Sequence, residues 1–411
     1  MKFLLFFFLS SFTIFTDFYF MVPALTFANF SLLIIICLTF LHKDVLWKSI
    51  NLSSNEQLSI IKIAFVFIIY IFIINLFNGI GLTYSIKTIL IQSACVLCLP
   101  LFNYFYYKEK FNFINWLYFF IFIHFIFVLF QSFGTSIVPR DLMPQNILIG
   151  VAESKNDGGF VKTTRATGAT SSPILLAQQA LAFLVITFVA FSKNVNLKNL
   201  LFFIFSITLL ISTQSRAAIF SFIPLMIMCN LLYKDFTIRK VISFSILIAA
   251  IIFITIINLP NLEIYFPYTF KIIDQGDTNR FYTNLYLSKG VLLESPIFGV
   301  APEVAWQIFE KYADANYMPF LLEDQRKVPT HHNQLFYFLR YYGLIGVALL
   351  FALYFKIFKA IRLVEDRNMA YLVGAIFVLD LFFSMTHNNK IFSPLLWIYL
   401  SLIFMPLKKE E

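Results

Sequence analysis

Long apolar runs follow one another along almost the whole chain, and they constrain its fold more than any other feature. Of the 411 residues, 60% are hydrophobic and 13% are charged, which does not suit a water-facing surface of ordinary polarity. A helix of about 20 apolar residues crosses the roughly 30 Å hydrocarbon core with its backbone hydrogen bonds satisfied internally. We therefore predict an all-α integral membrane protein. Its transmembrane helices, about twelve in number, are expected near residues 2–20, 22–41, 60–77, 86–107, 113–133, 173–191, 200–214, 217–232, 241–257, 338–358, 369–386 and 391–406.

The chain is expected to form a single polytopic membrane domain over residues 1–411. The first apolar run has no small-residue cleavage site, so it is expected to be a retained helix. The segment 258–337, between the ninth and tenth expected helices, is too long for a simple connector. It contains helical patterns of its own over Asn279–Glu294 and Glu303–Tyr317. We expect this large, partly helical loop to be periplasmic and to contain the site, because functional residues often lie in ordered loops held by a rigid scaffold.

Basic residues predict how the chain is oriented. With the N-terminus in the cytoplasm, alternate short loops contain most of the lysines, as the positive-inside rule requires. The C-terminus is then also cytoplasmic, and the loops near 134–172 and 258–337 are external. Arginine is unusually frequent outside, where six arginines are expected against three inside. The external ones are Arg140, Arg165, Arg216, Arg280, Arg326 and Arg340. The arginine fork binds phosphate through two hydrogen bonds, so this distribution indicates a phosphate-bearing ligand, unless it reflects chance or ion pairing within the loop.

A histidine-containing string lies where the large loop meets the tenth expected helix. It reads THHNQ over residues 330–334 and is followed by RYYGLIG over residues 340–346. A histidine with its ordinary pKa near 6.5 can take a proton from an attacking alcohol. The alternative is that His331 or His332 only caps a helix at the membrane surface.

Two arginines upstream stand in strings of their own. Arg216 ends the string STQSR over residues 212–216, at a tight turn between two expected spans, and Arg280 precedes the string LLESPIFG over residues 292–299. An arginine at membrane depth is costly. Arg216 therefore has either a functional role or a side chain that extends to the interface.

These strings resemble the O-antigen ligase and polymerase superfamily of bacterial surface-polysaccharide enzymes. In the ligases, a His is followed by Asn, Ser or Gln, then nine residues, Gly, two residues, and Gly, Thr or Tyr. His332, Asn333, Gly343 and Gly346 match this pattern without a gap. The two glycines are expected to allow close helix packing rather than to touch substrate. One departure is that ligases often have a second histidine two positions earlier, where this chain has Thr330.

The arginines extend the resemblance. Arg216 resembles the family's arginine at a span boundary, and Arg280 resembles the arginine that opens the large periplasmic loop. Arg165, followed by Ala-Thr-Gly, resembles a segment that precedes the sixth span. The resemblance runs over about residues 163–400, and the first five expected helices match only in hydropathy.

The resemblance implies transfer of a glycan from undecaprenyl diphosphate to an acceptor hydroxyl. It places this reaction on the periplasmic face of the bacterial inner membrane and requires neither a metal nor a cofactor. Arg216 and Arg280 would hold the diphosphate, and His332 would orient or deprotonate the hydroxyl, so these three are the expected catalytic residues. The expected substrate-binding residues are Arg165, His331, Asn333 and Arg340.

Three functions remain open. The gapless motif favours the ligase, whose acceptor is the lipid A core oligosaccharide, whereas the polymerase would use a second lipid-linked glycan. A flippase or transporter of lipid-linked sugars would show inverted repeats and charged residues near the midplane of the membrane. The sequence shows no such repeat, and Asp380 is the one charged residue expected near the midplane. The expected partners are thus an undecaprenyl-diphosphate-linked glycan, its acceptor and membrane lipid, and nucleic acid is not among them.

Overall fold

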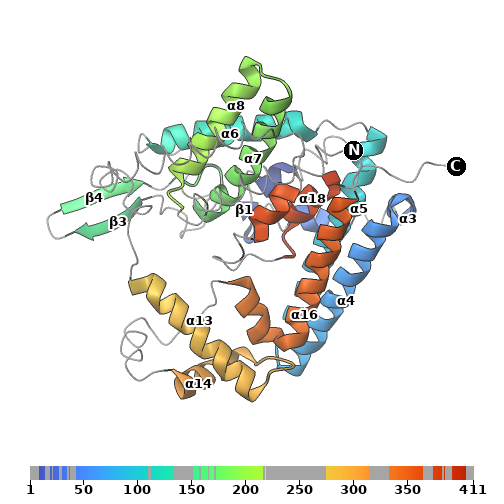
Figure 1. The fold of residues 1–411 in the computed structure, drawn as a ribbon, viewed down its shortest axis with the longest axis vertical. Coiled ribbons are helices and arrows are strands. Elements are labelled where there is room, and N and C mark those ends of the chain that lie inside the picture. The colour runs from blue at the N-terminus through green and yellow to red at the C-terminus, as the bar shows by residue number, and fades with distance from the viewer. Residues whose placement is uncertain are drawn as a thin grey trace, which may run out of the picture. The chain divides into compact units, whose positions relative to one another are not determined.

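The computed structural model shows a predominantly helical chain (Figure 1). It describes residues 9–13, 19–20, 22–26, 30–34, 37, 43–109, 113–132, 151–156, 159–164, 166–170, 173–215, 218, 275–313, 333–363, 374–381, 384 and 391–403. The helices described with both ends are α3 (Lys43–Leu52), α4 (Asn55–Phe77), α5 (Leu82–Glu109), α6 (Phe113–Ser132), α7 (Pro173–Lys193), α8 (Leu197–Ser212), α13 (Gln275–Glu294), α14 (Pro302–Tyr312), α16 (Gln334–Arg362) and α18 (Pro394–Ile403). Two antiparallel hairpins are formed by β1 (Tyr19–Phe20) with β2 (Val22–Thr26) and by β3 (Val151–Asn156) with β4 (Gly159–Thr164).

The expectation of a helical membrane protein is confirmed for the described part of the chain. Five expected spans, 60–77, 86–107, 113–133, 173–191 and 200–214, coincide with α4 to α8. Four helices within α4, α5, α7 and α16 are long and apolar enough to cross a membrane. The expected spans 217–232 and 241–257 lie outside the described residues, apart from Ala218, so the total of twelve stays a prediction.

The two hairpins depart from a purely α-helical fold. Strand β2 occupies the beginning of the expected second span, 22–41, and β3 pairs with β4 inside the expected external loop 134–172. In the second case, the Asp-Gly pair at 157–158, between the two strands in the sequence, is a common hairpin signal. In the first, the β-branched Val22 and Thr26 of this short stretch favour an extended strand.

The chain divides into two compact units. Unit 1 comprises residues 1–41, 105–271 and 365–379, and unit 2 comprises residues 42–104, 272–364 and 380–411. In unit 1, α7 and α8 form a helical hairpin and α6 packs on α8. Stacked rings hold α6 to α8, with centroid distances of 4.4 Å for Tyr118–Phe202 and 4.1 Å for Phe125–Phe205.

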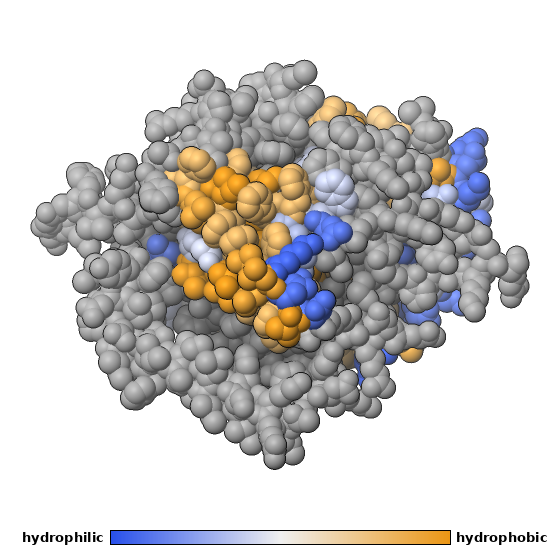
Figure 2. All heavy atoms as spheres, turned by 90° about the horizontal axis from the view of Figure 1, so that it is seen from above, coloured by the Kyte–Doolittle hydropathy of each residue, from blue (hydrophilic) through white to orange (hydrophobic). Residues whose placement is uncertain are grey.

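The outward side of α8 is apolar. Figure 2 shows hydrophobic residues gathered on the face viewed from above, where α8 lies in Figure 1. The exposed large side chains of this helix are those of Leu197, Leu200, Leu201, Ile204 and Ile211. Such a surface suits hydrocarbon better than water.

In unit 2, helix α16 reverses its direction at Gly343. This glycine has φ 61° and ψ −163°, which interrupts the helix. The hydroxyl of Tyr354 donates to Oε1 of Gln334 at 3.1 Å, although twenty residues of straight helix would separate them by about 30 Å. The first half, 334–342, therefore folds back beside the second half, 344–362 (Figure 1). The expected tenth span, 338–358, lies within α16 and is interrupted at Gly343. The apolar run continues through the reversal, so the sequence did not indicate it.

Helices α13 and α14 confirm the helical patterns expected inside the large loop, although α14 ends at Tyr312. They enclose a small core formed by Leu287, Val291, Val300, Ala305, Ile308 and Phe309. A Cβ atom at Gly290 would lie 2.3 Å from Cγ2 of Ile308, so glycine lets the two helices approach closely.

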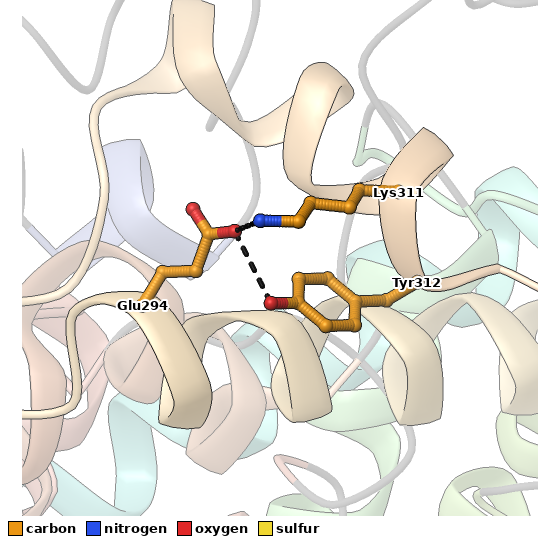
Figure 3. Close-up of polar contacts among 3 residues, drawn as sticks. All are labelled: Glu294, Lys311 and Tyr312. Carbon is orange, nitrogen blue, oxygen red and sulfur yellow. Dashed lines mark hydrogen bonds and ion pairs between the residues drawn. The ribbon is translucent and has the colours of Figure 1, made fainter.

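A surface contact joins the ends of this helical pair (Figure 3). Lys311 Nζ lies 2.6 Å from Glu294 Oε1, and the Tyr312 hydroxyl donates to the same oxygen at 3.2 Å. The hydrogen bond from Lys311 lowers the pKa of the Glu294 carboxyl, so the pair is ionised at neutral pH. Because both groups are exposed, the pair contributes little to stability, and the apolar core holds the helices together.

Candidate functional site

The structure describes three of the seven predicted site residues at least in their backbone. Arg280 lies on α13, Asn333 precedes α16, and Arg340 belongs to the first half of α16. The predicted residues outside the described part of the chain are Arg165, Arg216, His331 and His332.

Asn333 is the N-cap of α16. Its Oδ1 accepts hydrogen bonds from the backbone N–H of Leu335 at 2.8 Å and of Phe336 at 3.3 Å, which satisfies two donors at the start of the helix. The capping function considered for the neighbouring histidines is thus performed by Asn333. Its predicted contact with substrate stays a prediction, and His332 directly precedes this cap in the chain.

Arg340 is buried in the first half of α16. Only 1% of the residue is exposed, and its guanidinium carbon lies 4.6 Å from the centroid of the Tyr341 ring. This geometry is a cation–π contact. Any contact of Arg340 with substrate would therefore require this buried side chain to become accessible.

The reversal of α16 leaves three backbone carbonyls at the end of its first half. A continuing helix would have used them, and a buried carbonyl needs a donor. Each of the three carbonyls accepts a hydrogen bond from a donor in a distant part of unit 2. Arg340 O accepts from Val300 N at 2.7 Å, Tyr341 O from Asn78 Nδ2 at 3.5 Å, and Tyr342 O from the Tyr70 hydroxyl at 2.7 Å.

The second half of α16 begins against the loop that follows α13. The backbone N–H of Leu344 donates to Pro296 O at 2.8 Å, and that of Ile345 donates to Ile297 O at 3.5 Å. These are the first N–H groups after the break, which have no partner within the new helix. The string SPIFG over 295–299 therefore serves as an acceptor for the start of this half.

Two glycines allow these loops to touch. A Cβ atom at Gly343 would lie 2.1 Å from Ile297 O, and one at Gly299, where φ is 76°, would lie 2.4 Å from Arg340 O. The expectation that Gly343 serves helix packing is wrong, because its neighbour is a loop backbone. The expectation holds for Gly346, whose Cβ would lie 2.4 Å from Cβ of Tyr342 in the other half of the helix.

Unit 2 therefore brings together two strings that are far apart in the sequence. The loop that directly follows α13, the helix that includes Arg280, is joined to the segment that follows His332 by three backbone hydrogen bonds between 296–300 and 340–345. Backbone contacts of this kind restrict the position of both strings.

Unit 1 joins the other two arginine-containing strings. The backbone N–H of Ala166, which follows Arg165, donates to Ser212 O at 3.0 Å. Helix α8 ends at Ser212, and Gln214 has φ 48°, a left-handed conformation common after a helix end. The chain thus turns two residues before Arg216, as expected for a span boundary.

Two residues that the sequence analysis did not select hold the segment 166–170. Gln131 Oε1 accepts from the backbone N–H of Thr167 and of Gly168, both at 3.0 Å. His124 Nδ1 accepts from the N–H of Ala169 at 3.2 Å. The sequence did contain a signal for these contacts, namely a glutamine and a histidine inside an otherwise apolar helix. Polar side chains at membrane depth are costly unless they have a hydrogen-bond partner.

A cleft of about 270 Å³ lies in unit 2 beside the first half of α16. It is lined by Ile71 and Asn75 of α4, by Tyr84, Lys87, Thr88, Ile91 and Gln92 of α5, by Tyr337, Phe338 and Tyr342 of α16, and by Ile391 and Phe392 before α18. Aromatic and aliphatic side chains form much of its walls, and amide, hydroxyl and amino groups lie among them. Among the described residues, no group of three His, Cys, Asp or Glu side chains could hold a metal ion.

The chain matches one known protein family. Residues 201–351 match the family described as O-antigen ligase. The matched segment contains Arg216, Arg280, His332 and Arg340, and Arg165 lies before it. No curated protein matches the chain.

Proposed function

We propose that the chain is a membrane glycosyltransferase acting on a lipid-linked glycan, because residues 201–351 match the family described as O-antigen ligase. The donor is a glycan on undecaprenyl diphosphate, and the acceptor is a hydroxyl of the lipid A core oligosaccharide. The gapless match of the histidine motif favours this ligase reaction. A polymerase, which transfers the same donor to a second lipid-linked glycan, is the alternative.

The proposed reaction is a direct displacement at the anomeric carbon. His332 takes the proton of the acceptor hydroxyl as its oxygen bonds to the anomeric carbon. The bond from that carbon to the diphosphate breaks, and the diphosphate leaves with the electron pair. Arg216 and Arg280 stabilise the charge that develops on the leaving group. Displacement of this kind inverts the anomeric centre and requires no metal.

One structural observation supports this assignment most directly. The loop after α13 and the reversal of α16 are joined through Gly299 and Gly343, with hydrogen bonds on both sides of the reversal. This junction restrains the Arg280-containing helix relative to the segment that follows His332. A reaction that needs a cation and a base at one anomeric carbon requires such fixed geometry.

The proposed site faces the periplasm, because undecaprenyl-linked polysaccharide is transferred on that side of the inner membrane in the family. We expect cysteines introduced at Asn156 in β3 and at Asp314 to react with a membrane-impermeant thiol reagent in intact spheroplasts. The four native cysteines are first replaced by serine. Val195, which is 76% exposed and lies in an expected cytoplasmic loop, is the control, and its cysteine variant should react only after lysis. Protection of either external position before lysis would contradict the topology.

The arginines are expected to tolerate lysine poorly. Arg216→Lys and Arg280→Lys keep the charge but lose the two-pronged fork that matches a diphosphate. Each should therefore lose most transfer activity, by roughly tenfold or more, while protein levels stay normal. The matched control is Arg362→Lys, at the exposed far end of α16, which should transfer at the wild-type rate. Full activity of both test variants would show that these arginines are structural.

The lipopolysaccharide of a strain that lacks the gene separates the two reactions. Loss of all long chains with polymer accumulating on the lipid carrier is expected for a ligase. A core that bears a single repeat unit would instead identify a polymerase.

A further inference from the structure

We propose that the cleft between α4, α5 and the first half of α16 binds a pyranose ring of the glycan substrate, with Gln92 as the acceptor for a sugar hydroxyl. This inference rests on the proposed function and adds a subsite whose lining includes none of the seven predicted site residues.

The cleft is built at the end of unit 2 where α16 reverses. The hydrogen bonds from Tyr70 and Asn78 hold the C-terminal end of α4 against Tyr342 and Tyr341. The same end of α4 and the first turns of α5 line the cleft. Tyr337 of the cleft follows His332 by only five residues in the chain, so the cleft adjoins the segment to which the catalytic histidine belongs.

One face of α5 supplies much of the polar lining. Its lining residues are Tyr84, Lys87, Thr88, Ile91 and Gln92, and the steps 84–87–91 and 84–88–92 of three or four residues place them on one side of a helix. Lys87 and Tyr84 are exposed, and Gln92 lies deeper along the helix. Along α5, the lining thus changes from exposed cationic and hydroxyl groups to a less exposed amide.

The chemistry of Gln92 decides which ligand fits. Its Oε1 is buried and has no hydrogen-bond partner, so it needs a donor. A sugar hydroxyl provides that donor. An isoprenoid chain has no polar hydrogen, and an ionised diphosphate has only acceptor oxygens, so neither would satisfy this atom.

The remaining walls also fit a sugar. Of the aromatic side chains in the lining, Tyr337 is partly exposed, and the face of such a ring packs against the apolar C–H side of a pyranose ring. Thr88 and Lys87 provide further donors for ring and exocyclic oxygens. A site of this kind combines apolar stacking with a few oriented polar groups.

The test compares Gln92→Leu with the wild type by direct binding to the detergent-purified full chain. The probes are the glycan released from its lipid carrier by mild acid, the core oligosaccharide, and undecaprenyl phosphate. We expect Gln92→Leu to weaken binding of one of the two sugar probes by about five- to tenfold, the loss expected for one hydrogen bond. The probe that is affected identifies whether donor or acceptor occupies the cleft. Undecaprenyl phosphate should bind with unchanged affinity.

Stability measurements separate a ligand contact from a structural one. Because Gln92 Oε1 has no partner in the protein, leucine should leave the midpoint of thermal unfolding unchanged or raise it. Thr83→Val is the matched control: Thr83 lies on the same end of α5 but does not line the cleft, and its loss of polarity should not affect sugar binding. Lys87→Met, at the exposed end of the cleft, provides a second variant and should weaken the same sugar probe.

The inference is overturned if Gln92→Leu binds both sugar probes as the wild type does, or if it weakens undecaprenyl phosphate instead. It is also overturned if the variant loses affinity only together with thermal stability. Absence of transfer by the wild-type protein would contradict the proposed function, whereas loss of sugar binding in Gln92→Leu would still support the subsite.

Discussion

Replacing His332 with alanine is expected to lower the rate of glycan transfer by about 100- to 10,000-fold, the usual contribution of general-base catalysis. In the proposed mechanism, this imidazole accepts the proton of the attacking hydroxyl. The lipid-linked donor should still bind, because the proposed diphosphate contacts come from Arg216 and Arg280. The measurement is single-turnover transfer with reconstituted protein, together with donor binding by the same preparation.

His331 is the internal control for this experiment. The motif assigns catalysis to His332, and the structure assigns capping of α16 to Asn333. His331→Ala should therefore retain most of the transfer rate. If His331→Ala abolishes transfer and His332→Ala does not, the motif has been assigned one residue too late. Normal transfer by both variants would remove the motif from the mechanism.

Replacing Gly343 with alanine is expected to disrupt the site without touching any catalytic group. The conformation of Gly343, with φ 61° and ψ −163°, costs other residues about 1–3 kcal/mol. A Cβ atom would also lie 2.1 Å from the backbone oxygen of Ile297. That oxygen cannot move away without weakening the hydrogen bond from Ile345. We expect Gly343→Ala to lower the thermal midpoint, because it destabilises the folded state by at least this backbone strain of about 1–3 kcal/mol, and to lower the transfer rate, because the two loops can no longer meet in the same geometry.

Two other glycines separate the causes of this effect. Gly79 also has a positive φ of 73°, but a Cβ atom there would meet nothing within 4 Å. Gly79→Ala therefore measures backbone strain without a clash. Gly81 has neither constraint, so Gly81→Ala should behave as the wild type. If Gly343→Ala is no more damaging than Gly79→Ala, the contact between the two loops does not hold the site together.

Local sequence patterns predicted the elements whose stability depends on their own residues. Helices α4 to α8 follow their apolar runs because a helix in hydrocarbon satisfies its backbone without help from the rest of the chain. Helix α14 begins at Pro302, a residue that favours the first turn and interrupts a preceding helix. The candidate catalytic residues were also identified from sequence, because the chemistry of arginine and histidine belongs to the side chain.

Features that depend on distant partners were not predicted. The sequence from Leu335 to Ile361 reads as one long apolar helix, and a glycine within such a run does not by itself specify a reversal. The cleft could not be predicted for the same reason. The polar face of α5 lines a cleft only when α4 and α16 pack beside it, and the sequence of α5 does not specify that packing.

By itself, therefore, the sequence determined that this is a helical membrane protein, and it indicated a resemblance to the O-antigen ligase and polymerase superfamily together with candidate residues for binding a diphosphate and accepting a proton. The tertiary structure alone decided that α16 folds back at Gly343. The physical reason is that the break leaves backbone carbonyls and N–H groups that must be paired. Val300, Asn78 and Tyr70 provide the donors, and these residues reach the break only when α4 and the loop after α13 have packed against α16.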